Sequence, residues 1–476
     1  MGRLSEYEQY DAIGLAKLVA QGEVTPAELL EEAIARAEAL NPKLNAINLP
    51  FYERARERAA GELPRGPLRG VPFLLKDLGT SWQGTHTTWG SALFKDNVAD
   101  HNSELVRRYE NAGLVIFGKT ATPEFGLTTS TESRLWGATH NPWNLEHTAG
   151  GSSGGTAAAI AAGIVPAADG SDGGGSIRIP AACCGLVGLK PSRGRISHMP
   201  DRGESWSGMS TGGCLSRSVR DSALLLDISG GYVGGDPYTA PAPDKPFLRA
   251  LDSPPPKLRI AFHTTAYNGA ETHADCRAAV EDVAALCAEL GHAVEERILE
   301  PDRQGMARAG RIIVAAHTRR MVDDRLAQLN RTLRDDDLEP LTRATYDSAS
   351  RYSAADYVFA INALHRAGRD VAAFLTDYDL ILTPTMATPP MKLGGPLRLS
   401  HPDSKEFSAA LAQTVGYTQF YNASGNPAIN VPLHWNQAGL PIGVQFAAPY
   451  GEDALLLQLA AQLSQARPWG QRRPRI

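Results

Sequence analysis

Residues 172–180 read DGGGSIRIP and lie in the most Gly- and Ser-dense part of the chain, residues 149–195. Three glycines before Ser176 free the backbone for unusual dihedral angles, and successive N–H groups can then converge on an anion. A serine at the end of such a nest could attack a carbonyl carbon while the N–H groups hold the developing oxyanion. Taken alone, the stretch is equally compatible with a glycine-rich turn that carries a solvated serine.

A lysine follows the apolar run at residues 71–75, which is a candidate for a short strand. Burial disfavours the charged form of a lysine, so a partly desolvated Lys76 would be a usable base. A surface lysine at the end of a strand is the alternative interpretation of this position.

Residues 113–120 match the phosphate-loop pattern GxxxxGK[ST] letter by letter, but their context contradicts it. The four middle residues are large and apolar, and the segment before them is a helix candidate where a phosphate loop needs a strand. We therefore expect a buried strand here, with Gly113 as the C-cap of the preceding helix.

Residues 150–154 contain GxSxG, the pattern of the nucleophile in serine esterases of the α/β-hydrolase type. That fold needs an apolar strand directly before the serine, whereas residues 143–149 read as a polar loop. It also needs an acid and a histidine further along, and nothing local marks Asp379 or His434 for these roles. A serine esterase is therefore only an alternative.

Composition indicates an ordinary globular enzyme of 476 residues, with 43% hydrophobic and 21% charged residues. The net charge of −5 gives no basic surface for nucleic acid. The N-terminal MGRLSEYEQYD has no apolar signal core, and residues 157–168 are too short and too weakly apolar to cross a bilayer, so we expect a cytoplasmic protein without membrane contact. Five cysteines without CxxC spacing indicate reduced core thiols.

Three stretches together, GVPFLLKD at 70–77, GGSSGG at 150–155 and DGGGSIRIP at 172–180, closely resemble in order and spacing the amidase signature family. Further segments resemble the family as well: residues 118–120, 130–133, 141–143, 184–191, 379–385 and 439–445. The resemblance therefore covers about residues 10–465.

The resemblance implies a single large α/β/α domain around a twisted mixed β-sheet, spanning residues 1–476. Its expected parts are N-terminal helices at 1–65, the signature core at 66–235, a Pro-rich connector at 236–258, a helical insert at 275–375 and a sheet-completing part at 376–476. Within the first part, Thr25-Pro26-Ala27-Glu28 predicts a capped helix start. Strands are expected at 114–117, 380–382, 428–431 and 442–446, and helices at 218–229 and 454–465.

The resemblance also implies a catalytic triad without metal or organic cofactor. Lys76 falls on the family's base, Ser152 on a relay serine held by a cis peptide bond, and Ser176 on the nucleophile that forms an acyl-enzyme. The oxyanion-hole amides fall on Gly173, Gly174, Gly175 and Ser176.

Three neighbours of the triad are predicted to support it. Ser153 stands beside the relay serine, while Asp172 and Arg178 flank the nucleophile and are interpreted as positioning the loop, with substrate contact as the alternative. The sequence departs from the commonest family pattern at Ser171 and Gly173. The missing side chain at Gly173 is expected to widen the wall beside the oxyanion hole.

The implied activity is hydrolysis of a carbon–nitrogen amide-type bond, in an amide or a carbamate, with ester hydrolysis as a related activity. Residues 420–428 look closer to stand-alone amidases of aryl amides, nylon-type oligoamides or urethanes than to the alternative, a glutamine-hydrolysing subunit of a tRNA-dependent amidotransferase. A small-molecule substrate and a homodimer are expected. The pocket is expected to be walled by the helical insert and by residues 130–133 and 203–213. Three candidate apolar contacts are alternatively plain core: Trp206, Met209 and Tyr421.

Overall fold

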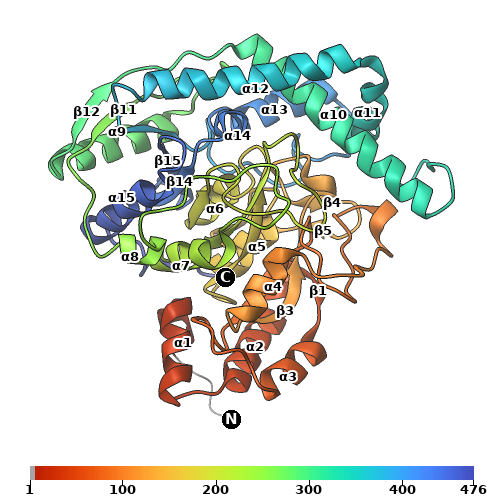
Figure 1. Cartoon of the computed structure of the whole chain (residues 1–476), viewed down its shortest axis with the longest axis vertical. Helices are drawn as coiled ribbons and strands as arrows, with labels where there is room; N and C mark the ends of the chain where they lie inside the picture. Colours follow the sequence, from red (N-terminus) through yellow and green to blue (C-terminus); the bar gives the residue numbers. More distant parts are fainter. Residues whose placement is uncertain (1–5) are drawn as a thin grey trace.

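The centre of the computed structural model, which describes residues 6–476, is a sheet of eight strands in the order β12-β11-β13-β15-β14-β9-β10-β8 (Figure 1). β11 pairs in parallel with β12 and β13, and the other neighbours are antiparallel. The strand bounds are β8 (Ala167–Asp172), β9 (Val187–Lys190), β10 (Thr211–Ser216), β11 (Arg259–Phe262), β12 (Ala293–Glu296), β13 (Leu380–Pro384), β14 (Ala428–Trp435) and β15 (Pro441–Ala447). The predicted α/β class with a large mixed sheet is confirmed.

A second, three-stranded sheet adjoins the first and has the order β1-β3-β2, with bounds Ile47–Pro50, Val115–Thr120 and Pro72–Lys76. β2 and β3 are parallel and buried along their whole length. β2 lies beside β8, where the backbone N–H of Lys76 donates to the carboxylate of Asp169 at 3.1 Å. This junction brings the end of β2 next to the strand that leads into residues 172–180.

The N-terminal helices form as predicted: α1 (Ala12–Gln21), α2 (Pro26–Leu44) and α3 (Tyr52–Ala60). Thr25 caps α2 and Glu28 reaches back to it, so the expected capping box is present. β1 was not predicted from the sequence. Its four residues are too few to show an alternating pattern, and they are extended because they pair with β3.

The segment that mimics a phosphate loop is a strand, as its apolar residues predict. α4 (Glu104–Asn111) ends just before Gly113, whose φ of 86° fits a helix C-terminus, and β3 follows. The serine of GxSxG is likewise not preceded by a buried strand. The segment before it, β7 (Asn144–Thr148), pairs with the short β6 (His140–Asn141), forms one isolated bridge to Lys392 and is partly exposed.

The helical insert is α10 (Arg303–Gln328), α11 (Pro340–Ser348) and α12 (Ala354–Phe374), which lie together at the top of Figure 1. The range 275–375 expected to be helical also includes β12, and α9 (Ala274–Glu289) packs on β13 and β15 rather than on the insert. β12 was not predicted, because its sequence, AVEE, has no apolar run. The strand lies at the edge of the sheet and is largely exposed.

The remaining helices are α5 (Gly154–Ala161), α6 (Arg178–Cys184), α7 (Val219–Ser229), α8 (Phe247–Ala250), α13 (Ser404–Val415), α14 (Gln419–Ser424) and α15 (Asp453–Ala466). Short elements are β4 (Glu132–Ser133), β5 (Gly137–Ala138), η1 (Tyr7–Gln9), η2 (Ala92–Phe94), η3 (Glu124–Gly126) and η4 (Ala349–Arg351). The predicted helices at 218–229 and 454–465 are thus present. All five cysteines are buried, as expected of core thiols. No helix within residues 6–476 is both long and apolar enough to cross a membrane.

Candidate active site

The predicted base is the last residue of β2 and is fully buried. The Nζ atom of Lys76 lies 2.8 Å from Oγ of Ser152 and 3.0 Å from Oγ of Ser171. Burial lowers the pKa of Lys76 to about 7, against the opposing pull of the carboxylates of Asp169 and Asp172. A lysine with such a pKa has a substantial neutral fraction near pH 7, and the neutral amine is the form that can accept a proton.

Asp169, in β8, lies beside this lysine, yet their side chains form no ion pair within 4.0 Å. Its carboxylate accepts hydrogen bonds from the backbone N–H of Lys76, from the Thr80 hydroxyl at 2.9 Å and from the Tyr109 hydroxyl at 3.2 Å. Burial raises the pKa of Asp169 to about 6. No described carboxylate lies within 4.0 Å of the Lys76 ammonium, so desolvation of that ammonium outweighs the attraction of Asp169 and Asp172.

The relay serine lies in the loop between β7 and α5, and the peptide bond Gly151–Ser152 is cis. The Thr131 hydroxyl donates to the carbonyl of Gly150 at 2.9 Å and accepts from the N–H of Gly154 at 3.1 Å. Residues 130–133 are buried, and Thr131 supports this loop through these two hydrogen bonds. Their expected place in the pocket wall stays a prediction.

The predicted nucleophile lies between β8 and α6 and is half-buried. Its carbonyl accepts from the N–H of Ser153 at 3.3 Å, and the Ser153 hydroxyl donates to the carbonyl of Ser171, also at 3.3 Å. These contacts join the relay loop to the nucleophile loop. Within residues 6–476 the Ser176 hydroxyl makes no hydrogen bond, and such catalytic contacts commonly tighten only when substrate is bound.

The glycine nest before the nucleophile is present, but one of its four expected donors is already engaged. The N–H of Gly175, a residue with φ of 130°, donates to the Asp172 carboxylate at 2.7 Å. This part of the prediction needs correction, since an N–H held by a carboxylate cannot also face an oxyanion. The N–H groups of Gly173, Gly174 and Ser176 have no partner in the described part of the chain.

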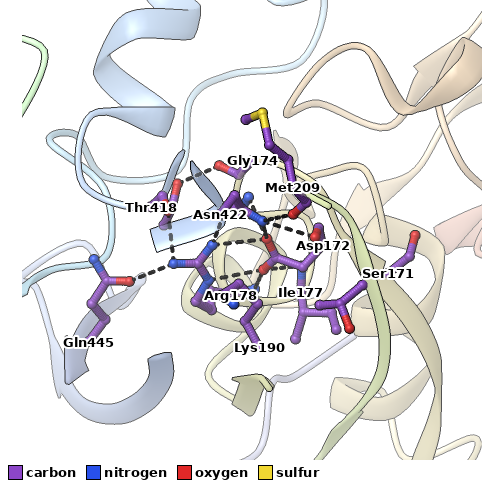
Figure 2. A network of polar contacts seen from close by, with 12 residues as sticks. Ser171, Asp172, Gly174, Ile177, Arg178, Lys190, Met209, Thr418, Asn422 and Gln445 are labelled. Atoms are coloured by element: carbon purple, nitrogen blue, oxygen red, sulfur yellow. Dashed lines mark hydrogen bonds and ion pairs between the residues drawn. The ribbon is translucent and has the colours of Figure 1, made fainter. Parts of the chain in front are cut away.

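A buried ion pair fixes the nucleophile loop (Figure 2). The guanidinium of Arg178 donates to both carboxylate oxygens of Asp172, at 2.9 and 3.0 Å. Its other N–H groups reach the carbonyl of Thr418 at 3.0 Å, the side-chain oxygen of Gln445 at 3.0 Å and that of Asn422 at 2.7 Å. The cation holds the pKa of the Asp172 carboxyl well below its usual range despite burial. Both residues therefore support the loop and do not reach its exposed side.

The sequence alone did not point to the residues that complete this network. The Asn422 amide donates to the carbonyl and carboxylate of Asp172, both at 2.9 Å, and the Thr418 hydroxyl donates to the carbonyl of Gly174 at 2.6 Å. A buried amide in the segment 420–428 and another in β15 were the available signals, because buried polar groups need partners. Their partner could not be read from the sequence, since Gln445 and Arg178 are 267 positions apart.

The wall beside the nest is not widened by Gly173, contrary to expectation. A Cβ atom at this position would lie 3.0 Å from Cε3 and 3.2 Å from Cζ3 of Trp206. The indole thus occupies the space that a side chain would fill. Of the three candidate apolar contacts, Met209 and Tyr421 are buried core residues, whereas Trp206 is only half-buried.

The residues that a serine esterase would need are engaged elsewhere. The carboxylate of Asp379 accepts from the backbone N–H of Arg259 at 2.7 Å, and Nδ1 of His434 lies 3.4 Å from the carboxylate of Asp282. Neither contacts Ser152 or Ser176. Among residues 6–476, no three side chains of His, Cys, Asp or Glu converge in a way that could hold a metal ion.

Comparison with known proteins identifies the family to which the chain belongs. The chain is 39% identical over 98% of its length to the 6-aminohexanoate-cyclic-dimer hydrolase of Paenarthrobacter ureafaciens, of which it covers 96%. A solved structure of 6-aminohexanoate cyclic dimer hydrolase complexed with substrate superimposes with a TM-score of 0.93 at 37% identity, over 98% of this chain and 99% of the other. A bacterial aryl acylamidase of the amidase signature family does so with a TM-score of 0.89 at 27% identity, over 98% of both chains. The family model described as Amidase matches residues 28–457, and the protein therefore belongs to the amidase signature family of hydrolases.

Proposed function

We propose that this amidase cleaves its substrate through an acyl-enzyme formed on Ser176, with Ser152 as proton relay and Lys76 as base. The observation that carries the proposal is the 2.8 Å contact between Nζ of Lys76 and Oγ of Ser152, at a lysine whose pKa is lowered to about 7. A serine hydroxyl is a weak nucleophile until a base takes its proton. A neutral lysine buried beside a serine supplies such a base.

In the first half-reaction, Ser176 Oγ attacks the carbonyl carbon of the substrate and passes its proton to Ser152 Oγ. Ser152 passes its own proton to Nζ of Lys76, which becomes an ammonium. The carbon–nitrogen bond then breaks, and the leaving amine takes up a proton returned along the same chain. An ester between the acyl group and Ser176 remains.

In the second half-reaction, water attacks the ester carbonyl and gives up a proton along the same relay to Lys76. The bond between the acyl carbon and Ser176 Oγ breaks, Oγ regains a proton, and a carboxylic acid leaves. In both halves, negative charge develops on the carbonyl oxygen. The unpartnered N–H groups of Gly173, Gly174 and Ser176 would hold it, and one such donor contributes about 10²–10³ in rate.

The relatives narrow the choice of substrate. One of them is named for a cyclic dimer of 6-aminohexanoate and another for aryl acylamides, and both are matched over nearly their whole length. We propose oligoamides and aryl amides as the substrate class, and carbamates and esters as side activities of the same acyl-enzyme. The amidotransferase alternative is not favoured, because the close relatives are hydrolases. A homodimer remains an expectation from the family, which light scattering would check.

The test uses an amide, a carbamate and an ester that share one aryl leaving group, with wild type, Ser176→Ala and Lys76→Ala. We expect wild type to cleave the amide and both variants to lose that activity while keeping the wild-type circular dichroism spectrum. Mass spectrometry of quenched wild type should show an acyl group on Ser176. If only the ester is cleaved and Lys76→Ala retains that activity, the lysine mechanism is wrong.

A further inference from the structure

The half-buried indole of Trp206 is the one candidate pocket residue that keeps exposed surface beside the nest. Its six-membered ring faces Gly173, and the space between them is too small for a Cβ atom. Gly173, Gly174 and Ser176 are themselves only partly buried. The indole thus borders the accessible side of the group of N–H donors assigned above to the oxyanion.

The backbone of this segment is held in a conformation that side chains of this size rarely adopt. Trp206 and Ser207 have φ values of 50° and 53°, both in the left-handed region. A non-glycine residue in this conformation lowers the stability of the fold by about 1–3 kcal/mol, and it keeps the conformation only where the surrounding structure enforces it. Here the N–H of Met209 donates to the carbonyl of Trp206 at 3.0 Å, and Arg193 donates to the carbonyl of Gly208 at 2.7 Å.

The other side of the segment is tied to the helical insert. Oγ of Ser207 lies 2.6 Å from the hydroxyl of Tyr357 in α12 and 3.2 Å from Nε2 of His317 in α10. The Tyr357 hydroxyl lies 3.3 Å from the same imidazole nitrogen, which closes a triangle of polar contacts. Burial lowers the pKa of His317 and so favours the neutral imidazole, whose unprotonated nitrogen can accept one of these hydrogen bonds. Through Ser207, the helical insert therefore holds the backbone next to Trp206 in place.

The direction of proton transfer indicates which part of a bound substrate lies next to the indole of Trp206. The leaving amine must lie near Ser152, because it takes its proton from the relay. The acyl group attached to the same carbonyl carbon then points away from the relay, and we assign it to the side of the nest that Trp206 borders at Gly173. A flat, rigid indole held there restricts the space next to the carbonyl carbon, which a branched acyl group needs and an unbranched chain does not.

We propose that Trp206 is the specificity-determining residue for the acyl group, selecting amides of unbranched acyl chains against those branched at the carbon next to the carbonyl. The proposal rests on the proposed role of Ser176 as nucleophile. Ser207, His317 and Tyr357 are positioning residues that act through Trp206. The indole takes the place of the side chain that Gly173 lacks, so the two positions form a compensating pair.

The test compares kcat/KM for the 4-nitroanilides of hexanoic and 2,2-dimethylhexanoic acid in wild type and Trp206→Ala. One methylene in an apolar pocket is worth about 10–200-fold, so we expect the wild-type preference for the straight chain to shrink by about tenfold or more in the variant. Ser207→Ala should shift the ratio in the same direction by less, and should add nothing in a Trp206→Ala background. Rates of Ser176 labelling by straight and branched alkyl fluorophosphonates, followed by mass spectrometry, should show the same change without requiring amide turnover.

Trp435→Ala is the matched control, because Trp435 is also half-buried but packs against Trp143, with tilted rings, at the end of β14. It should leave the ratio at the wild-type value. An unchanged ratio in a folded Trp206→Ala enzyme that still cleaves the straight-chain amide would overturn the inference and leave the proposed function intact. Absence of both cleavage and labelling in wild type would overturn the proposed function, and the inference with it.

Discussion

Two buried acid–base pairs lie at the end of β8, and they are compensated differently. Asp172 and Arg178 form a bidentate ion pair, and backbone or side-chain partners satisfy their remaining polar atoms. Asp169 and Lys76 are equally buried but are joined only through the backbone N–H of the lysine. In the first pair the two charges are in direct contact and share hydrogen bonds, whereas in the second the groups attract only at a distance and desolvation is the larger effect on each.

The difference separates a structural charge from a chemical one. Pairing holds the pKa of Asp172 well below its usual range, so its charge is fixed over the whole neutral region. Without pairing, burial lowers the pKa of Lys76 to about 7 and raises that of Asp169 to about 6. The ion-paired carboxylate thus holds the nucleophile loop, while the lysine beside it can titrate. Both groups are equally buried, so the presence or absence of a directly contacting opposite charge decides whether the group stays charged near pH 7.

The largest expected effect is the loss of activity when Lys76, which has no ion-pair partner, is replaced. Lys76→Met should lower kcat/KM for an amide by about 10²–10⁴-fold, the usual contribution of a general base. Because no ion pair is lost, the urea midpoint should hardly change. Lys190→Met is the matched control: burial also lowers the pKa of Lys190 to about 7, but its Nζ donates to the Pro191 carbonyl and touches no serine. Equal loss of activity in both variants would contradict the comparison.

For the ion pair of Asp172 and Arg178, the expected loss is in the stability of the fold. Arg178→Met leaves the Asp172 carboxylate buried without its cation, and breaking a buried pair in this way costs about 3–5 kcal/mol of unfolding free energy. Urea unfolding followed by fluorescence would measure it. Arg320→Met, which removes an exposed ion pair with Asp324 within α10, should cost only about 0–1 kcal/mol. The double variant Asp172→Asn/Arg178→Met should recover part of the loss; no recovery would mean that the pair is not what stabilises the loop.

A smaller effect is expected when the network is weakened and its ion pair is kept. Asn422→Ala removes two hydrogen bonds to Asp172 and one from Arg178, and should cost about 1–3 kcal/mol in urea unfolding. Asn436→Ala, at a half-buried turn, is the control and should cost less. A cost as large as that of Arg178→Met would show that the amide, and not the ion pair, dominates the compensation.

The smallest expected effect is a shift in pH dependence. The base must be neutral, and the neutral fraction of Lys76 falls as pH falls below its pKa of about 7, so kcat/KM should drop about tenfold per pH unit below that value and level off above it. Asp169→Asn removes a negative charge that favours the ammonium, and should move the midpoint to lower pH. A midpoint that stays in place or rises in this variant would contradict the assignment of the base.

Much of the fold could be predicted from local sequence. The capped start of α2, the buried strand at residues 115–120 and the strands of the C-terminal part each show their pattern within a few residues, because capping, burial and turns depend on near neighbours. β1 and β8–β12 were not predicted. β1, β9, β11 and β12 are each only four residues long, and β8 and β10 contain glycine in place of an unbroken apolar run.

The sequence by itself determined the order and spacing of Lys76, Ser152 and Ser176, and with them the family. Only the tertiary structure decided that the lysine lacks a carboxylate partner, that Asn422 and Gln445 complete the arginine's shell, and that an indole from residue 206 fills the space left by Gly173. The physical reason is that desolvation and ion pairing depend on groups brought together from segments far apart in the sequence. A local sequence pattern does not show which distant groups will be in contact.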